Sequence, residues 1–335
     1  MYLTPTNSRS KCNRSADGFG KIREEVYRFF FNRHSPQWLS VLRIGVAFTV
    51  ILYCISLRRD WNYLLAGHGG GLINREASEI LLSDQSDVIP RVSWFVQGGR
   101  QIGLSESTAL FLVWLAILDA ALLLLIGLFS RGAAIATWCL HVASVKSGGL
   151  LAYGVDNFTT IGLFYLMVAP LPDRWSMDYR SRKIPLKNGQ LHGFFRRVLQ
   201  LHLCLIYFFG GLAKSFGAGW WTGESIWRAF AHPPFNVIAP ETLVHWRFLF
   251  PIASISTVLL EIGYPFLMWP RYTRRVWLLG ILIMHVGIGL LMRMYLFASI
   301  MIILNLAAFG PGLIRRRLVT AAPKLADQET ALPRP

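Results

Sequence analysis

Several ionisable side chains that could take part in catalysis or binding lie inside or at the ends of long apolar segments. They are Arg43, Asp119, His141, His202, Lys214, Glu261 and His285. An ionisable group at bilayer depth costs at least about 2.5–3.5 kcal/mol on insertion scales, so each one marks a functional or a structural site. The histidines do not have the spacing of metal ligands, and we expect no metal site.

Lys214 is the most informative of these residues. It ends the run Tyr207-Phe208-Phe209-Gly210-Gly211-Leu212-Ala213-Lys214, in which Tyr207, Gly211 and Lys214 share one helical face. The adjacent glycines Gly210 and Gly211 let another helix or a flat ligand approach the backbone closely. A lysine partly withdrawn from water favours its neutral form, which a general base needs. The alternative is a lysine that snorkels, with its ammonium group among the lipid headgroups.

Glu261 and His285 lie within two later apolar runs, 248–269 and 276–292. We expect both side chains to point into a helix bundle, because exposure to hydrocarbon leaves a polar group unsatisfied. Each of them either lines a binding site or makes a structural hydrogen bond between helices.

The remaining ionisable residues favour structural roles. Asp119 and Arg43 are predicted to pair across the first two apolar segments. His141 and His202 are predicted to make hydrogen bonds between helices. The sequence contains no P-loop, no GxSxG, no CxxC, and no GxGxxG following a strand, so it lacks the common motifs of soluble enzymes.

The elements that must position these residues are membrane-spanning helices. The 335-residue chain is 53% hydrophobic and 16% charged, with a mean hydropathy of +0.42, whereas soluble domains carry about 25% charged residues. Its apolar residues come in long runs, which predicts an all-α, polytopic transmembrane bundle. Eight spans are expected, at about 39–57, 108–129, 132–148, 155–171, 198–214, 248–269, 276–292 and 295–309.

The basic residues predict the orientation of these spans. With the basic arm 1–37 and the tail 313–335 both on the cytoplasmic side, 23 of the 34 Lys and Arg residues lie inside and 10 outside. The domain between them covers 38–312. The net charge of +16 therefore reflects topology, and nucleic acid is not expected as a partner. The expected partner is the lipid bilayer.

Three stretches resemble the membrane domain of vitamin K-dependent γ-carboxylases and the related HTTM (horizontally transferred transmembrane) family. The first runs from Asp156-Asn157-Phe158 to a W-S-x-D box at 175–178. The second is the run that ends at Lys214, followed by Trp220 and Gly223. The third is Leu260-Glu261-Ile262-Gly263-Tyr264-Pro265, followed by Arg274-Arg275 and His285. The resemblance covers about residues 37–312.

The resemblance implies a quinol-dependent carboxylase or oxygenase that acts at the outer membrane face. In the carboxylases a lysine deprotonates the reduced vitamin K hydroquinone; Lys214 would take this role, with His285 as a supporting catalytic residue. The implied quinone pocket contains Tyr207, Gly210, Gly211, Trp220, Glu261, Asp156 and Asn157. The implied cofactor is a reduced quinone, menaquinone in a bacterium, where the protein would lie in the inner membrane.

Two departures from the family qualify this expectation. The chain has Phe158 near the start of the short span, where the carboxylases have a functional histidine, and it has no counterpart of their large lumenal region. A quinol-dependent reaction in the same pocket is therefore favoured over glutamate carboxylation itself. The alternative function is a non-catalytic membrane factor that helps to mature or export a small secreted peptide, as toxin-maturation proteins of this broad family do.

Overall fold

The computed structural model describes residues 9–32, 36–67, 75–149 and 152–311. These residues form helices joined by short connections, and no strand occurs among them, which confirms the expected all-α class. The predicted tail 313–335 lies outside the described residues, as do parts of the predicted arm 1–37.

The helices follow one another along the chain as α1 (Arg9–Phe31), α2 (Gln37–Leu57), α3 (Trp61–Leu65), α4 (Arg75–Gln85), α5 (Val92–Gln101), α6 (Glu106–Ile126), α7 (Ser130–Ser147), α8 (Gly154–Val168), α9 (Met177–Arg180), α10 (Gly189–Ser215), α11 (Ala218–Thr222), α12 (Glu224–Ala231), α13 (Pro240–His245), α14 (Leu249–Leu267), α15 (Arg271–Leu291) and α16 (Tyr295–Phe309). A helix coincides with each of the eight predicted spans. Five of the described helices, α2, α6, α10, α14 and α15, are long and apolar enough to cross a membrane, and α16 is a shorter apolar helix. The protein is therefore an integral membrane protein, while the count of eight spans and the orientation of the ends stay predictions.

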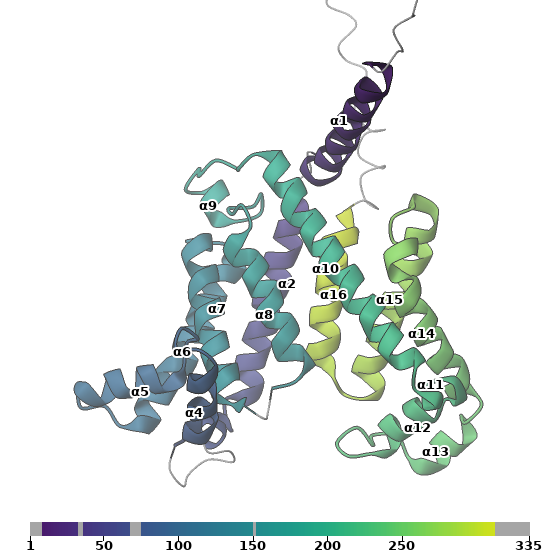
Figure 1. Cartoon of the computed structure of the whole chain (residues 1–335). Coiled ribbons are helices and arrows are strands. Elements are labelled where there is room, and N and C mark those ends of the chain that lie inside the picture. The colour runs from purple at the N-terminus through teal and green to yellow at the C-terminus, as the bar shows by residue number, and fades with distance from the viewer. Residues whose placement is uncertain (1–8, 33–35, 68–74, 150–151, 312–335) are drawn as a thin grey trace, which may run out of the picture.

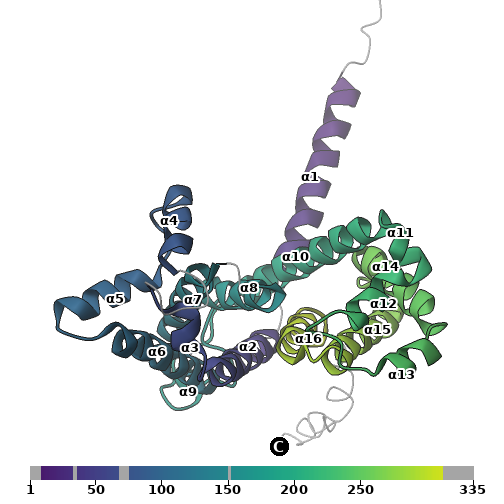
Figure 2. The same ribbon diagram turned by 90° about the horizontal axis from the view of Figure 1, so that it is seen from below.

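The bundle has a central layer and two flanking groups of helices (Figures 1 and 2). Helices α2, α8 and α16 lie at the centre, with α6 and α7 on one side and α10, α14 and α15 on the other. The short helices α11 to α13 lie at one end of the bundle, together with α4, whereas α9 and α1 lie at the opposite end (Figure 1). Helices α4 and α5 from one polar segment and α11 to α13 from another thus lie at the same end of the bundle.

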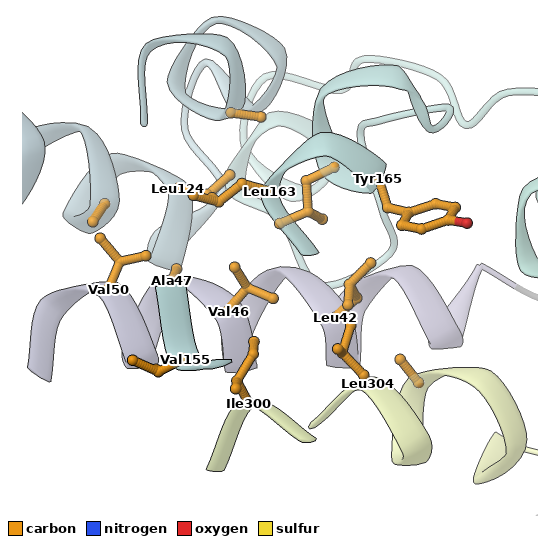
Figure 3. Close-up of a cluster of buried hydrophobic side chains, with 14 of the residues drawn as sticks. Leu42, Val46, Ala47, Val50, Leu124, Val155, Leu163, Tyr165, Ile300 and Leu304 are labelled. Atoms are coloured by element: carbon orange, nitrogen blue, oxygen red, sulfur yellow. The ribbon is translucent and has the colours of Figure 1, made fainter. Parts of the chain in front are cut away.

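The core joins α2 to α8 and α16 through aliphatic side chains (Figure 3). Val46 and Leu42 of α2 face Leu163 of α8 and Ile300 of α16, and all four are fully buried. The backbones of α2 and α16 approach closely at Gly45 of α2. An added Cβ at this position would lie 2.6 Å from the Ile303 side chain of α16. Small residues at such contacts provide the packing that holds transmembrane helices together.

A buried ion pair fixes one end of α2. The guanidinium group of Arg43 lies 2.5 Å from the Asp173 carboxylate and donates to the carbonyl oxygens of Leu124 and Leu125, where α6 ends. The prediction that Arg43 pairs with Asp119 is therefore wrong. Asp119 is exposed, because α6 turns the face that carries Ile117 and Leu124 toward the core and Asp119 lies on the other side.

The 175–178 box has a structural role in the same region. The carboxylate of Asp178 accepts hydrogen bonds from the backbone N–H groups of Phe129 and Ser130 and from the Ser130 hydroxyl, at the first turn of α7. Arg182 donates a further bond at 3.0 Å. Burial alone raises the pKa of Asp178, but the Ser130, Phe129 and Arg182 donors outweigh it and the net effect lowers this pKa. The segment thus fastens the connection between α8 and α10 to the start of α7.

Candidate functional site

Lys214 at the end of α10 forms an ion pair with Glu261 in the middle of α14. The Nζ atom of Lys214 lies 2.6 Å from Oε2 of Glu261, with side-chain exposures of 28% and 10%. The ammonium group also lies 5.5 Å from the centre of the Trp220 ring, which adds a cation–π contact. Lys214 is thus held by a counter-charge within the bundle and does not simply snorkel into the headgroups.

Gly211 brings the two helices of this pair together. A Cβ added at Gly211 would lie 2.8 Å from both the Glu261 Cβ and the backbone nitrogen of Ile262. Any larger residue would therefore push α10 away from α14. The predicted close approach of a helix at the glycine pair occurs at Gly211, while Gly210 lines the cavity described below.

A second polar cluster forms around Tyr207, which lies about two helical turns before Lys214 on α10. The Tyr207 hydroxyl lies 2.7 Å from Nε2 of His285, and Nδ2 of Asn305 donates to the same hydroxyl at 2.7 Å. The Tyr264 hydroxyl donates to Oδ1 of Asn305 at 2.7 Å. All four side chains are buried, so the cluster ties α10, α14, α15 and α16 together deep in the bundle.

The pattern of donors in this cluster favours one tautomer of His285. Because the Tyr207 hydroxyl accepts from Asn305, its own hydrogen is free to be donated to Nε2 of His285. The imidazole then carries its proton on Nδ1. This atom is buried and has no hydrogen-bond partner within the described ranges. An unsatisfied buried N–H is costly, and a ligand oxygen at this position would satisfy it.

Both clusters line one large cavity at the α11–α13 end of the bundle. Its volume is about 1000 Å³, and its wall contains Tyr207, Gly210, Lys214, Glu261 and His285. Most of the other wall residues are apolar or aromatic; they include Phe158, Trp220, Ile226, Phe230, Leu243, Trp246, Leu249, Phe250, Ile283 and Phe297. Ile283 and Leu249 are also exposed, so the cavity opens on the lipid-facing side. Its size and lining suit an apolar ligand with a few polar atoms.

The structure brings most of the predicted site residues together. Lys214, His285, Tyr207, Gly210, Trp220 and Glu261 line the cavity, and the prediction that Glu261 and His285 point into the bundle is confirmed by their exposures of 7% and 3%. Asp156 lines a different cavity and Asn157 is exposed. Phe158, one residue further along α8, is the one that reaches the site.

Two members of the buried cluster were not predicted from the sequence. Asn305 is the sole amide in the apolar run 295–309, and Tyr264 lies three residues after Glu261, on the same face of α14. An amide inside an apolar span is a signal of the same kind as the ionisable residues. His141 and His202 make the predicted contacts between helices, with the Asp156 carbonyl and the Tyr165 hydroxyl respectively.

Comparison with known proteins adds no relative: no family model, no curated protein and no solved structure matches this chain.

Proposed function

We propose that this protein is a membrane-bound enzyme that binds a reduced quinone in the cavity beside Lys214 and Glu261 and takes a proton from one of its hydroxyl groups. The observation that supports this most is that two polar clusters, one partly exposed and one buried, line one otherwise apolar cavity of about 1000 Å³. The resemblance of the 207–214 run to the γ-carboxylase signature, in which a lysine deprotonates the hydroquinone, points to the same chemistry.

The wall residues fit such a ligand. A reduced quinone has a flat ring with hydroxyl groups and a long apolar tail. Aromatic residues such as Phe158 and Phe297 offer surfaces for a ring, and the apolar residues near Ile283 offer a path for a tail toward lipid. The N–H of His285, which has no partner in the described chain, can donate to a ring oxygen. When bound, the quinol supplies an acidic hydroxyl group and two reducing equivalents.

The Lys214–Glu261 pair is the group that would accept the proton. Lys214 donates to Glu261 at 2.6 Å and is the cationic partner of this ion pair. Glu261 can take a proton on a carboxylate oxygen, while the ammonium group of Lys214 offsets the negative charge left on the ligand oxygen. This assigns proton acceptance to Glu261 and charge stabilisation to Lys214, whereas the sequence by its residues predicts a neutral lysine as the base.

Binding and turnover of menaquinol-4 test the proposal. The purified full chain, reconstituted in nanodiscs, should bind menaquinol-4 saturably and quench the fluorescence of the wall residues Trp220 and Trp246. The Lys214→Met variant should bind at least about tenfold more weakly, because a charge-assisted contact contributes roughly 1.5–3 kcal/mol. With dioxygen as the electron acceptor, which the two reducing equivalents convert to hydrogen peroxide, Glu261→Gln should form oxidised quinone about 100-fold more slowly, the usual loss for a general base.

The matched control is Lys187→Met, which removes an exposed lysine outside the cavity. This variant should bind and oxidise menaquinol-4 as the unchanged protein does. Equal menaquinol-4 affinity in the Lys214→Met and Lys187→Met proteins would overturn the proposal, and so would an absence of saturable binding by the unchanged chain.

A further inference from the structure

A second cavity lies where α2, α7 and α8 meet α3, at the end of the bundle that also carries α4. Its volume is about 460 Å³, and it shares no lining residue with the cavity beside Lys214. Asp156, at the first turn of α8, lines this cavity, while Phe158 two residues later lines the other. The start of α8 thus separates two distinct chambers.

Aromatic side chains make up much of the wall of this second cavity. They are Tyr53 from α2, Trp61 and Tyr63 from α3, and Tyr153 immediately before α8. The faces of aromatic rings carry partial negative charge and attract cations, and clusters of such rings recognise alkylated ammonium groups. Tyr63 and Tyr153 are also about half exposed, which leaves the cavity open to the membrane–water interface.

Two carboxylates in the same wall add negative charge. Asp156 is 4% exposed and accepts a hydrogen bond from the backbone N–H of Tyr153 at 2.9 Å. It lies in the first turn of α8, beside the side chain of Tyr53. Asp60 is exposed, and its side chain makes no hydrogen bond or ion pair with the described residues.

No lysine, arginine or histidine lines this cavity among the described residues. Arg58 is directed at the ring of Trp114 on α6, with its guanidinium carbon 5.9 Å from the ring centre. Arg59, which directly precedes Asp60, is exposed and forms no ion pair with it in the described part of the chain. Neither Asp60 nor Asp156 lies within ion-pair distance of a basic group in the described part of the chain. A buried carboxylate without a counter-charge is costly, so a cationic ligand would stabilise this wall.

We infer that the second cavity binds an organic cation, a protonated or quaternary amine, with Asp60 and Asp156 as counter-charges and the four aromatic residues as its cage. The described residues include no cluster of three or more metal-ligating side chains, and the aromatic wall suits an alkylated ammonium group better than a metal ion. Either a small free amine or the headgroup of a choline lipid presents this chemistry at the interface.

Calorimetric titration of the full chain tests the inference. The protein is reconstituted in nanodiscs that contain only phosphatidylglycerol, and choline is titrated in one arm and lysophosphatidylcholine in another. The comparison ligand for the first arm is 3,3-dimethylbutan-1-ol, which has the shape of choline without the charge. It should bind at least about tenfold more weakly than choline if cation–π and carboxylate contacts hold the ammonium group.

Two variants link the binding to this cavity. Asp60→Asn and Tyr153→Leu should each weaken binding about three- to tenfold, the loss expected for one partly exposed cation contact. Asp84→Asn is the matched control, because Asp84 is an exposed aspartate of α4 that does not line the cavity. Its affinity should be unchanged, and the melting temperatures of all three variants verify that they are folded.

Each result decides the inference. Binding of choline itself supports a free amine as the ligand, and binding of lysophosphatidylcholine alone supports a lipid headgroup; both results support an organic-cation site. The inference is overturned if neither ligand binds, if choline and its uncharged analogue bind equally, or if Asp60→Asn binds as tightly as Asp84→Asn.

Discussion

The Nζ atom of Lys214 on α10 lies 2.6 Å from Oε2 of Glu261 on α14, directly beside the point where Gly211 brings the two helices into contact. The ion pair therefore depends on helix packing as much as on charge. It places one positive and one negative group in the wall of an apolar cavity, where either can act on a ligand hydroxyl.

Replacement of Lys214 tests whether this lysine stabilises negative charge on the ligand or itself takes the proton. A guanidinium group can still pair with Glu261 but is not deprotonated at usable pH. We expect Lys214→Arg to keep at least about a tenth of the menaquinol oxidation rate, while Lys214→Met loses about 100-fold, the usual range for removal of one oriented charge. The rates are measured in air-saturated buffer, with dioxygen as the electron acceptor, as oxidised quinone formed per minute. Complete loss in Lys214→Arg would show instead that Lys214 is itself the base.

The close contact at Gly211 predicts a steric effect. Gly211→Ala places a methyl group 2.8 Å from the backbone nitrogen of Ile262, so we expect a loss of about 1–3 kcal/mol in unfolding free energy and weaker menaquinol binding. Gly132→Ala is the control, because an added Cβ at Gly132 has no neighbour within 4 Å. Thermal unfolding in detergent compares the two variants. Equal melting temperatures would contradict the packing role of Gly211.

The hydroxyl of Tyr207 should matter for binding as well as for stability. Tyr207→Phe removes the hydroxyl that joins His285 to Asn305, and we expect it to cost about 0.5–1.5 kcal/mol of stability and to weaken menaquinol-4 binding. Tyr165→Phe removes a comparable buried hydroxyl, bonded to His202 outside the cavity. The Tyr165→Phe variant should lose a similar amount of unfolding free energy and bind menaquinol-4 as tightly as the unchanged protein. Equal menaquinol-4 affinities in the two variants would show that the Tyr207 hydroxyl does not contribute to binding.

Asp178 predicts how stability depends on pH. Its folded pKa is lowered below the unfolded value of about 3.9, so the deprotonated carboxylate stabilises the folded state above about pH 4. This stability is lost as the pH falls through the folded pKa. Melting temperatures of the unchanged protein and Asp178→Asn should differ at pH 7 and converge toward pH 3. A constant difference across this range would mean that the donors from Ser130 and Phe129 do not lower this pKa.

The predicted orientation can be tested by labelling single cysteines in a cysteine-free background. Lys187→Cys lies between α9 and α10, and His232→Cys follows α12 at the opposite end of the bundle. Both positions are exposed. A membrane-impermeant maleimide added to intact cells should modify position 232 and leave position 187 unmodified, since the positive-inside rule places the 172–197 segment in the cytoplasm. Labelling of position 187 alone would invert the orientation.

The class of this protein and the positions of its helices can be predicted from local sequence alone. Apolar runs must be buried in lipid or protein wherever they fall, and their backbone groups must be satisfied within the segment, so each run predicts a helix without knowledge of its neighbours. The helical period placed Tyr207, Gly211 and Lys214 on one face for the same local reason. Costly polar groups at bilayer depth then marked Lys214, Glu261 and His285 as candidates.

Which polar groups meet could not be predicted from the sequence and depends on how the helices pack. Lys214 pairs with Glu261 across 47 positions of sequence, and Arg43 pairs with Asp173 across 130 rather than with Asp119. The packing of the bundle also places Asp156 in a separate cavity. The physical reason is that an ion pair depends on the rotation and neighbours of two helices, which side-chain packing over the whole bundle determines, whereas hydrophobicity acts on each helix locally.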